Sequence, residues 1–280
     1  MSSDVAAERS LSGKVMVMSG GSRGIGLAIA LRAAEDGAKV TLIAKTAEPH
    51  PRLEGTIYTA AEEIEKAGGE CLAFVGDVRD DQAVAAAVQQ TVDRFGGVDI
   101  VVNNASAIDL ADPENLPMKR YDLMQDINTR GTYLLTSSCL PHLKKAENPH
   151  ILTLSPPLNL KPRWFAPNLA YTIAKYGMSM CTLGFAENYR SDGVAANSLW
   201  PRTTIATAAI QNLLGGEEAM RRARDPRIMA DAAHAILTRP SRECTGNFFI
   251  DDEVLAEEGI TDLSVYGGVE AELQLDVFLD

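Results

Sequence analysis

Cysteine and histidine are scarce in this 280-residue sequence, and neither occurs at a spacing typical of a metal site. The four cysteines are scattered without a CxxC pair, which favours buried free thiols in a reducing compartment over a disulfide framework. The four histidines, His50, His142, His150 and His234, form no HExxH pattern. We therefore expect no metal ligands.

Long apolar runs and an excess of positive charge are also absent. No run approaches the roughly 18 residues that a membrane-spanning helix needs, and the opening MSSDVAAERS has no apolar centre typical of a secretory signal. The final residues DVFLD match no peroxisomal or prenylation signal. The formal net charge of −12 disfavours nucleic acids and anionic membranes as partners. These features predict a cytoplasmic protein.

Short apolar segments alternate with longer amphipathic ones along the chain. We predict strands over residues 14–20, 38–44, 70–78, 98–106, 150–155, 194–201 and 246–252. We predict helices over 26–37, 57–69, 81–97, 118–147 and 168–190, and less regular helix over 203–240. No break in composition divides the chain, so residues 1–280 are expected to form one domain. The pattern predicts an α/β fold, a doubly wound parallel sheet (Rossmann fold) of about seven strands with helices on both faces.

Two irregular segments, 157–167 and a region near 203–230, each follow the carboxyl end of a predicted strand. Ligands bind outside the carboxyl ends of strands in open α/β sheets. We therefore expect the substrate to lie against these segments.

A glycine-rich turn, SGGSRGIG over residues 19–26, joins the first strand to the first helix. Glycine permits positive φ and close approach of the backbone to a pyrophosphate, and the helix N-terminus offers free N–H groups. The turn predicts a dinucleotide phosphate site, although a tight turn without a ligand is the alternative. The residues that we assign to this site are Gly20, Ser22, Arg23, Gly24, Ile25 and Gly26.

The end of the second strand favours NADP (NADPH) over NAD. An NAD site usually places an acidic residue there to hold the ribose 2′-hydroxyl. This strand ends in Ala44 and Lys45, and no acid precedes Glu48. Lys45 and Arg23 would face a 2′-phosphate, unless both are simply solvated surface charges. Asp77 in the motif GDV ends the third strand and could accept a hydrogen bond from the adenine amino group.

Tyr171 and Lys175 lie four residues apart on a predicted helix and share one face. A phenol has a pKa near 10, and a neighbouring ammonium would lower it by at most roughly three units. A phenol acidified in this way could serve as a general acid and base. In isolation, such a pair is more typical of an ordinary helix surface.

The motifs GGSRGIG, GDV, NNAS and YTIAK follow in this order, with an Asn in the helix after the fourth strand and a Pro ending the sixth. Together they resemble the short-chain dehydrogenase/reductase superfamily from about residue 12 to 252. The segments SPPLNL, NTRGTY and AYTIAKYGMSM resemble the reductase part of one subgroup whose eukaryotic members carry a sterol-carrier-like domain. The sequence ends at Asp280 without that domain, so we expect the reductase part alone.

The resemblance implies a role for each matching position. Tyr171 would be the acid and base, Lys175 would hold the nicotinamide ribose, and Asn128 would anchor a water in a proton relay through Lys175. A Thr after the sixth strand, Thr203 or Thr207, would contact the nicotinamide amide. The further positions that we assign to the cofactor are Asp77, Val78, Asn103, Asn104 and Pro201. Arg202 replaces the glycine that usually follows this proline.

The substrate-orienting serine of the superfamily has no direct equivalent. The position 13 residues before Tyr171 is Leu158, and aligning the fifth strand places Pro156 there. Ser155 lies one residue earlier and would face the opposite side unless the two prolines bend the chain. Asn159 could donate from its amide instead. Three alternatives remain: Ser155, Asn159, or no replacement.

The resemblance implies an NADP-dependent oxidoreductase acting on a hydrophobic carbonyl or alcohol, with Trp164, Phe165 and Trp200 in its pocket unless they are ordinary core. The alternative is a catalytically weak NADP-binding protein that acts as a lipid binder or scaffold, which Pro156, Pro157 and Arg202 motivate. The helices over 118–147 and 168–190 would form the interface of a homodimer or homotetramer.

Overall fold

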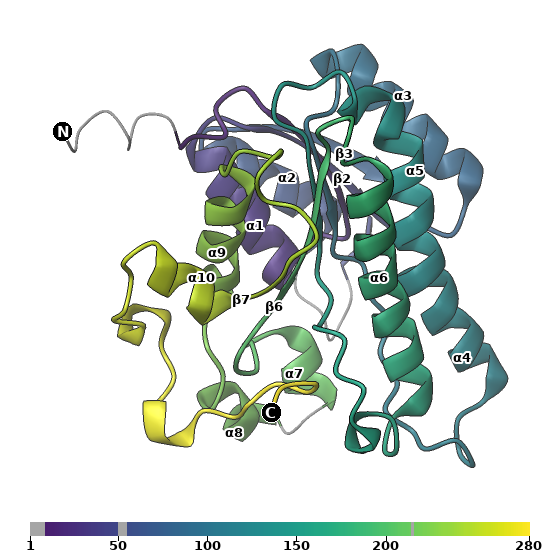
Figure 1. Ribbon diagram of the computed structural model, residues 1–280, viewed down its shortest axis with the longest axis vertical. Coiled ribbons are helices and arrows are strands. Elements are labelled where there is room, and N and C mark those ends of the chain that lie inside the picture. The colour runs from purple at the N-terminus through teal and green to yellow at the C-terminus, as the bar shows by residue number, and fades with distance from the viewer. Residues whose placement is uncertain (1–8, 50–54, 214–215) are drawn as a thin grey trace.

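The computed structural model describes residues 9–49, 55–213 and 216–280, whose arrangement is shown in Figure 1. His50 and residues 214–215 of the predicted substrate region lie outside the described residues.

Seven parallel strands form one sheet in the order β3-β2-β1-β4-β5-β6-β7, which confirms the predicted Rossmann fold. The strands are β1 (Val15–Ser19), β2 (Lys39–Ala44), β3 (Glu70–Val75), β4 (Ile100–Asn103), β5 (His150–Thr153), β6 (Ala195–Trp200) and β7 (Phe248–Ile250). Several end before their predicted limits. Ser19, Asn103 and Thr153 are level in the sheet, so the carboxyl ends of β1, β4 and β5 meet there. The strand order reverses between β1 and β4, where such sheets form a ligand crevice.

Helices cover both faces of the sheet (Figure 1). One face carries α1 (Gly24–Glu35), α2 (Ile57–Lys66), α9 (Arg227–Leu237) and α10 (Asp251–Glu257), and the other carries α3 (Asp81–Phe95), α5 (Gly131–Leu143) and α6 (Leu169–Asn188). Successive residues of a strand point to opposite faces of the sheet. Met16 and Met18 of β1 therefore pack toward α1, whereas Val17 packs toward α3 and α5. All three side chains are fully buried.

The predicted helix over 118–147 is present but irregular. It consists of α4 (Met118–Met124), a π-helical turn η1 (Gln125–Arg130) and α5. A π-turn within an α-helix often marks a functional site. The irregular connections contain η2 (Pro162–Trp164), α7 (Ala208–Leu213), α8 (Gly216–Arg221), η3 (Ser264–Tyr266) and η4 (Glu270–Glu272).

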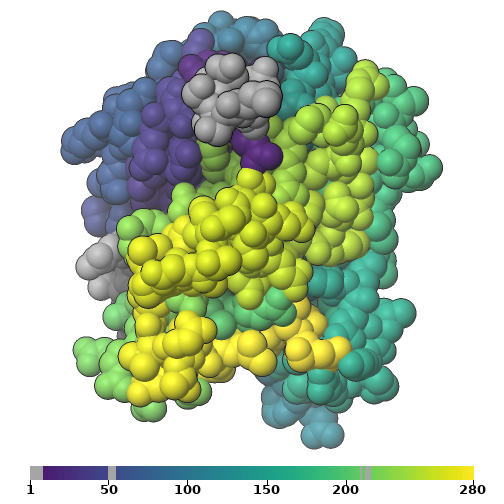
Figure 2. Space-filling model, turned by 60° about the vertical axis from the view of Figure 1, so that its left-hand side comes forward, coloured from purple at the N-terminus to yellow at the C-terminus, as the bar shows by residue number. Residues whose placement is uncertain are grey.

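The last thirty residues follow β7. They form α10 and then run across the lower part of the molecule, where the yellow end of the chain lies against green and teal segments (Figure 2). Across the described ranges, none of the helices is both long and apolar enough to cross a bilayer.

Candidate active site

The glycine turn has the geometry that phosphate binding requires. Gly20 and Gly24 adopt φ of 80° and 59°. A Cβ at Gly20 or Gly26 would lie 2.6 or 2.4 Å from Nδ2 of Asn104, so the turn and the end of β4 pack closely because these residues lack side chains. Arg23 precedes α1 in extended conformation without a side-chain cap. The first N–H groups of α1 therefore remain available to an anion.

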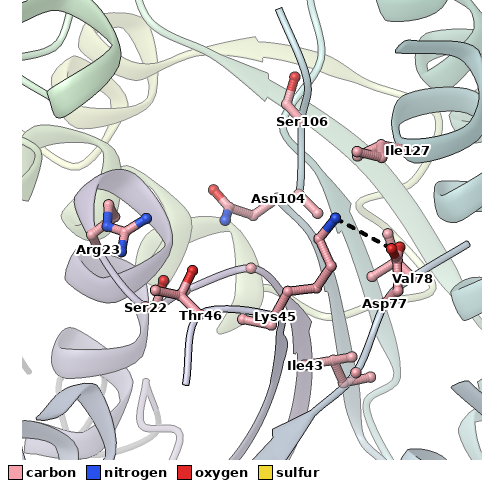
Figure 3. Close-up of a pocket in the computed structure, with 15 residues that line it drawn as sticks. Ser22, Arg23, Ile43, Lys45, Thr46, Asp77, Val78, Asn104, Ser106 and Ile127 are labelled. Carbon is pink, nitrogen blue, oxygen red and sulfur yellow. Dashed lines mark ion pairs between the residues drawn. The ribbon is translucent and has the colours of Figure 1, made fainter. Parts of the chain in front are cut away.

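A cavity of about 330 Å³ opens beside this turn, at the lower end of the range of small-molecule sites (Figure 3). The predicted cofactor residues on its wall are Gly20, Ser22, Arg23, Lys45, Asp77, Val78 and Asn104. Thr46, Ser106 and Ile127 also line the cavity but were not predicted, because they follow strand ends or lie on η1 without a distinctive motif. The described chain thus forms a cleft suited to the adenosine half of a dinucleotide.

The charges on this wall are partly paired. Lys45 Nζ lies 3.2 Å from Asp77 Oδ2, the ion pair dashed in Figure 3, and Arg79 binds the same carboxylate. The hydrogen bonds from Arg79 outweigh burial and, with Lys45, hold the pKa of Asp77 well below its usual range. Arg23 lies on the other side of the cavity and donates to the Gly55 carbonyl at 2.8 Å.

Tyr171 and Lys175 lie on α6, and both are largely buried, with 7% and 3% exposed. Lys175 Nζ donates to the Leu154 carbonyl at 2.6 Å, just beyond the end of β5. The same atom lies 5.0 Å from the ring centre of Trp200 at the end of β6. The lysine thus reaches across the strand ends beside the crevice.

The pKa shifts of this pair differ from the expectation of an acidic phenol. Burial, with a smaller contribution from the nearby carboxyl of Asp276, raises the pKa of Tyr171 above its usual value. Burial lowers the pKa of Lys175 to about 7, and Asp276 opposes that shift. In this arrangement the desolvation of both groups outweighs any acidification of the phenol by the amine.

Asn128 is fully buried in η1, where its side chain makes two hydrogen bonds to the backbone of one residue. Its Oδ1 accepts from Ala107 N at 2.7 Å and its Nδ2 donates to Ala107 O at 3.0 Å. Thr129 Oγ1 donates to Ala174 O at 3.1 Å, and Gly177 allows this close approach. The π-turn is therefore fastened beside the part of α6 that carries the Tyr–Lys pair.

The two candidates for the missing serine are both engaged elsewhere. Ser155 is fully buried, and its Oγ is hydrogen-bonded to Ser198 Oγ at 2.9 Å. Ser198 lies 2.9 Å from Thr182 Oγ1, so the three hydroxyls form a buried chain within the fold. Asn159 Nδ2 donates to Asp280 Oδ2 at 3.1 Å and to the Phe278 carbonyl at 3.4 Å.

The segment after β6 explains how Arg202 is accommodated. Pro201 is buried, and the Arg202 side chain turns toward α10, where it pairs with Asp252 at 3.0 Å and with Glu253. Thr203 pairs as an antiparallel bridge with Leu275, whereas Thr207 lies against the glycine turn. A Cβ at Gly24 would lie 3.3 Å from Thr207 Cγ2.

The predicted pocket aromatics gather around a residue that the sequence analysis did not identify. Trp164, Phe165 and Trp200 pack in one apolar cluster with Tyr171, Tyr176 and Phe278. Phe278 is 3% exposed, and its ring is stacked 6.2 Å from that of Tyr171. No local pattern links residues 107 positions apart, so only hydrophobicity near the end of the chain could have pointed to it.

The fold, the glycine turn and the Tyr–Lys helix together define a class of protein. The sequence profile described as short chain dehydrogenase matches residues 14–217, and the chain belongs to this family. Members of the family use nicotinamide cofactors, and membership supports a nicotinamide-dependent oxidoreductase.

Individual relatives are similar over nearly the whole chain. Hydroxysteroid dehydrogenase-like protein 2 of Xenopus tropicalis is 57% identical over 271 residues, which are 96% of this chain and 64% of that protein. The chain therefore spans less than two thirds of that relative. A crystal structure of a short chain dehydrogenase from Mycobacterium thermoresistibile is 61% identical with a TM-score of 0.92, covering 97% of this chain and 96% of that one. A dehydrogenase candidate from Xanthomonas campestris is 54% identical with a TM-score of 0.93, covering 97% and 99%. These similarities confirm the finer resemblance.

Proposed function

We propose that residues 1–280 act as one dinucleotide-binding unit, an NADP-preferring oxidoreductase that interconverts a hydrophobic carbonyl compound and its alcohol. The observation that carries the proposal is the meeting of three features at neighbouring strand ends. The glycine turn follows β1, Asn104 follows β4, and the Lys175 ammonium reaches the chain just after β5. Such an edge can hold a nicotinamide nucleotide and a substrate carbonyl together.

The preference for NADP rests on the cations of the cavity. Arg23 and Lys45 both line it, and residues 43–46 at the end of β2, which also line it, include no carboxylate. The Lys45 ammonium would have to contact both Asp77 and a 2′-phosphate. The lysine side chain is 56% accessible, so it can reach both groups. Thr207 is a better candidate than Thr203 for the cofactor contact, because its side chain lies against Gly24 of the turn.

The chemistry follows from the side chains of α6. A bound nicotinamide would supply the hydride in reduction and accept it in oxidation. Tyr171 would give its phenolic proton to the carbonyl oxygen in reduction and recover it in the reverse direction. Lys175 would stabilise the phenolate that remains and would hold the ribose. The apolar cluster around Tyr171 would exclude water and favour a hydrophobic substrate.

The direct test is NADPH-dependent turnover of a panel of hydrophobic aldehydes and ketones, with Tyr171→Phe as the comparison. We expect the variant to lose about 10²–10⁴-fold in kcat while NADPH affinity stays within about twofold. Equal turnover by both proteins would remove Tyr171 from the mechanism.

A second candidate is an NADP-binding protein with weak catalysis that acts as a lipid binder or scaffold. It is favoured by the Ser155 hydroxyl, which is committed to Ser198, and by Phe278, which covers Tyr171. Tight NADPH binding without turnover of any carbonyl in the panel would support this function over the first.

A homodimer or homotetramer in the cytoplasm completes the proposal. The outer faces of α5 and α6 expose apolar side chains, including Tyr133, Met180 and Leu183, of which 60%, 60% and 42% is accessible. Burying these faces against a second copy would remove apolar area from water. All four cysteines are free, as expected in a reducing compartment. Light scattering that shows a monomer would contradict the assembly.

A further inference from the structure

Residues 273–280, which we call the strap, contact both segments that were predicted to lie against the substrate. Its first part is held by the segment after β6: Thr204 N donates to Gln274 O at 2.9 Å and Asp276 N donates to Arg202 O at 3.0 Å. The Trp200 indole donates to the Val277 carbonyl at 3.0 Å.

The other end of the strap is held by the segment after β5. The Asp280 carboxylate pairs with Lys161 at 2.5 Å and with Arg163, and it accepts from Asn159. The strap therefore joins the two irregular segments that flank the predicted substrate site. Its outer end depends on partly exposed ion pairs, which contribute little to stability.

Between these anchors, Phe278 inserts its ring into the aromatic cluster. Ring centres of Tyr176, Trp200 and Trp164 lie 5.2, 5.9 and 6.1 Å from it, and Tyr171 is stacked on it. Phe278 adopts φ of 75°, the only positive φ at a residue other than glycine in the described ranges. A conformation of this kind persists where the surroundings impose it and often marks a functional site.

Two polar groups in the cluster are in unfavourable surroundings while the strap is in place. The Trp164 indole N–H is buried without a hydrogen-bond partner among the described residues, so an oxygen-bearing ligand would relieve it. The Asp276 carboxyl, carried in by the strap, is partly buried, and desolvation is the main reason that its pKa is raised to about 7. Asp276 also raises the pKa of Tyr171, which opposes acid–base chemistry.

We propose that the strap is a lid and that Phe278 is a specificity-determining residue, because its ring occupies the place of the apolar group next to the reacting carbonyl. This inference rests on the proposed function. The substrate's apolar group displaces the ring from between Tyr171, Trp164 and Trp200, and the displaced strap withdraws Asp276 from the Tyr–Lys pair. The aromatic cluster then accepts a compact ring or branched group about the size of a phenyl side chain.

The test compares the full chain with Phe278→Ala, Phe278→Leu and Asp280→Ala, using cyclohexanecarbaldehyde as the bulky probe and propanal as the small one. Phe278→Ala removes the ring that competes with the substrate's apolar group, so kcat/KM for the bulky probe relative to propanal should rise about tenfold. Phe278→Leu keeps the cluster filled, so this ratio of kcat/KM values should stay within about twofold of that of the unaltered protein. Asp280→Ala leaves the aromatic cluster intact but removes the ion pairs that hold the outer end of the strap. It should raise the same ratio about two- to fivefold. This variant keeps the proposal testable if Phe278→Ala folds poorly.

A second readout does not depend on turnover. The chain has two tryptophans, and both flank Phe278, so acrylamide quenching of their fluorescence reports the strap. Binding of cyclohexanecarbaldehyde should increase quenching in the unaltered protein, with an affinity about tenfold higher in Phe278→Ala. Unchanged quenching, or equal affinity in the two proteins, overturns the strap proposal. Quenching that changes without any turnover supports the strap and counts against the oxidoreductase instead.

Discussion

The ammonium of Lys175 donates to the backbone carbonyl of Leu154 at 2.6 Å, which joins α6 to the chain just beyond β5. The lysine is almost fully buried, and burial lowers its pKa to about 7. A buried amine of this kind is costly to the fold when it is charged. The fold is therefore destabilised at the position where the proposed mechanism needs a cation.

Lys175→Met should lower turnover at least about hundredfold and raise the free energy of unfolding. Because the folded pKa is about 7 and the usual value is 10.5, the penalty is fully present below pH 7 and disappears as the pH rises through 10.5. The gain in stability should therefore be largest near pH 6 and smallest near pH 10, as measured by denaturant unfolding. Lys119→Met, at an exposed position on α4, is the control. A gain that does not vary with pH would contradict a buried, destabilised amine.

Arg23→Ala and Lys45→Ala should each weaken NADPH binding about 10- to 100-fold, because each removes a charge-assisted contact to the 2′-phosphate. NADH, which lacks this phosphate, should lose no more than about threefold. Fluorescence titration of both nucleotides measures the difference, with the exposed Lys66→Ala as control. Equal losses for NADPH and NADH would mean that the two cations do not select the cofactor.

Ser155→Ala should change kcat by less than about twofold but lower the free energy of unfolding by about 1 kcal/mol. The reason is that the Ser155 hydroxyl is bonded to Ser198 inside the fold. Steady-state kinetics and denaturant unfolding on the same preparation give both values. Ser198→Ala is the matched control, because it removes another hydroxyl from the same hydrogen-bonded chain. A fall in kcat of a hundredfold at unchanged stability would instead make Ser155 the residue that orients the substrate.

Asp36 at the end of α1 should stabilise the protein above acidic pH. Burial opposes its ionisation, but hydrogen bonds from Leu11 N, His234 and Arg32 lower its pKa to about 2, from 3.8. This stabilisation, about 2 kcal/mol, is present above pH 3.8 and is lost as the pH falls through about 2. Asp36→Asn should therefore be less stable than the unaltered protein at neutral pH, with the difference shrinking in acid. Thermal unfolding from pH 7 to pH 2 measures it, and a constant difference would contradict the assignment.

The sequence by itself determined the parts of this protein whose physics is local. The alternation of apolar runs and amphipathic segments predicted the seven strands and their covering helices, because each element must bury one face. The glycine turn follows from residues 19–26 alone, since neighbouring residues set the backbone of a strand–turn–helix unit. Tyr171 and Lys175 share a helix face because residues four apart on a helix do so.

Only the tertiary structure decided what surrounds those residues. The strap brings Phe278 and Asp276 to Tyr171 across more than a hundred residues, through contacts that follow no periodicity in the chain. The direction of the Ser155 hydroxyl and the choice between Thr203 and Thr207 depend on where β6 and the strap lie. The pKa shifts of the Tyr–Lys pair reverse the expectation from spacing because desolvation depends on everything packed around a group, whereas spacing describes only its neighbours along one helix.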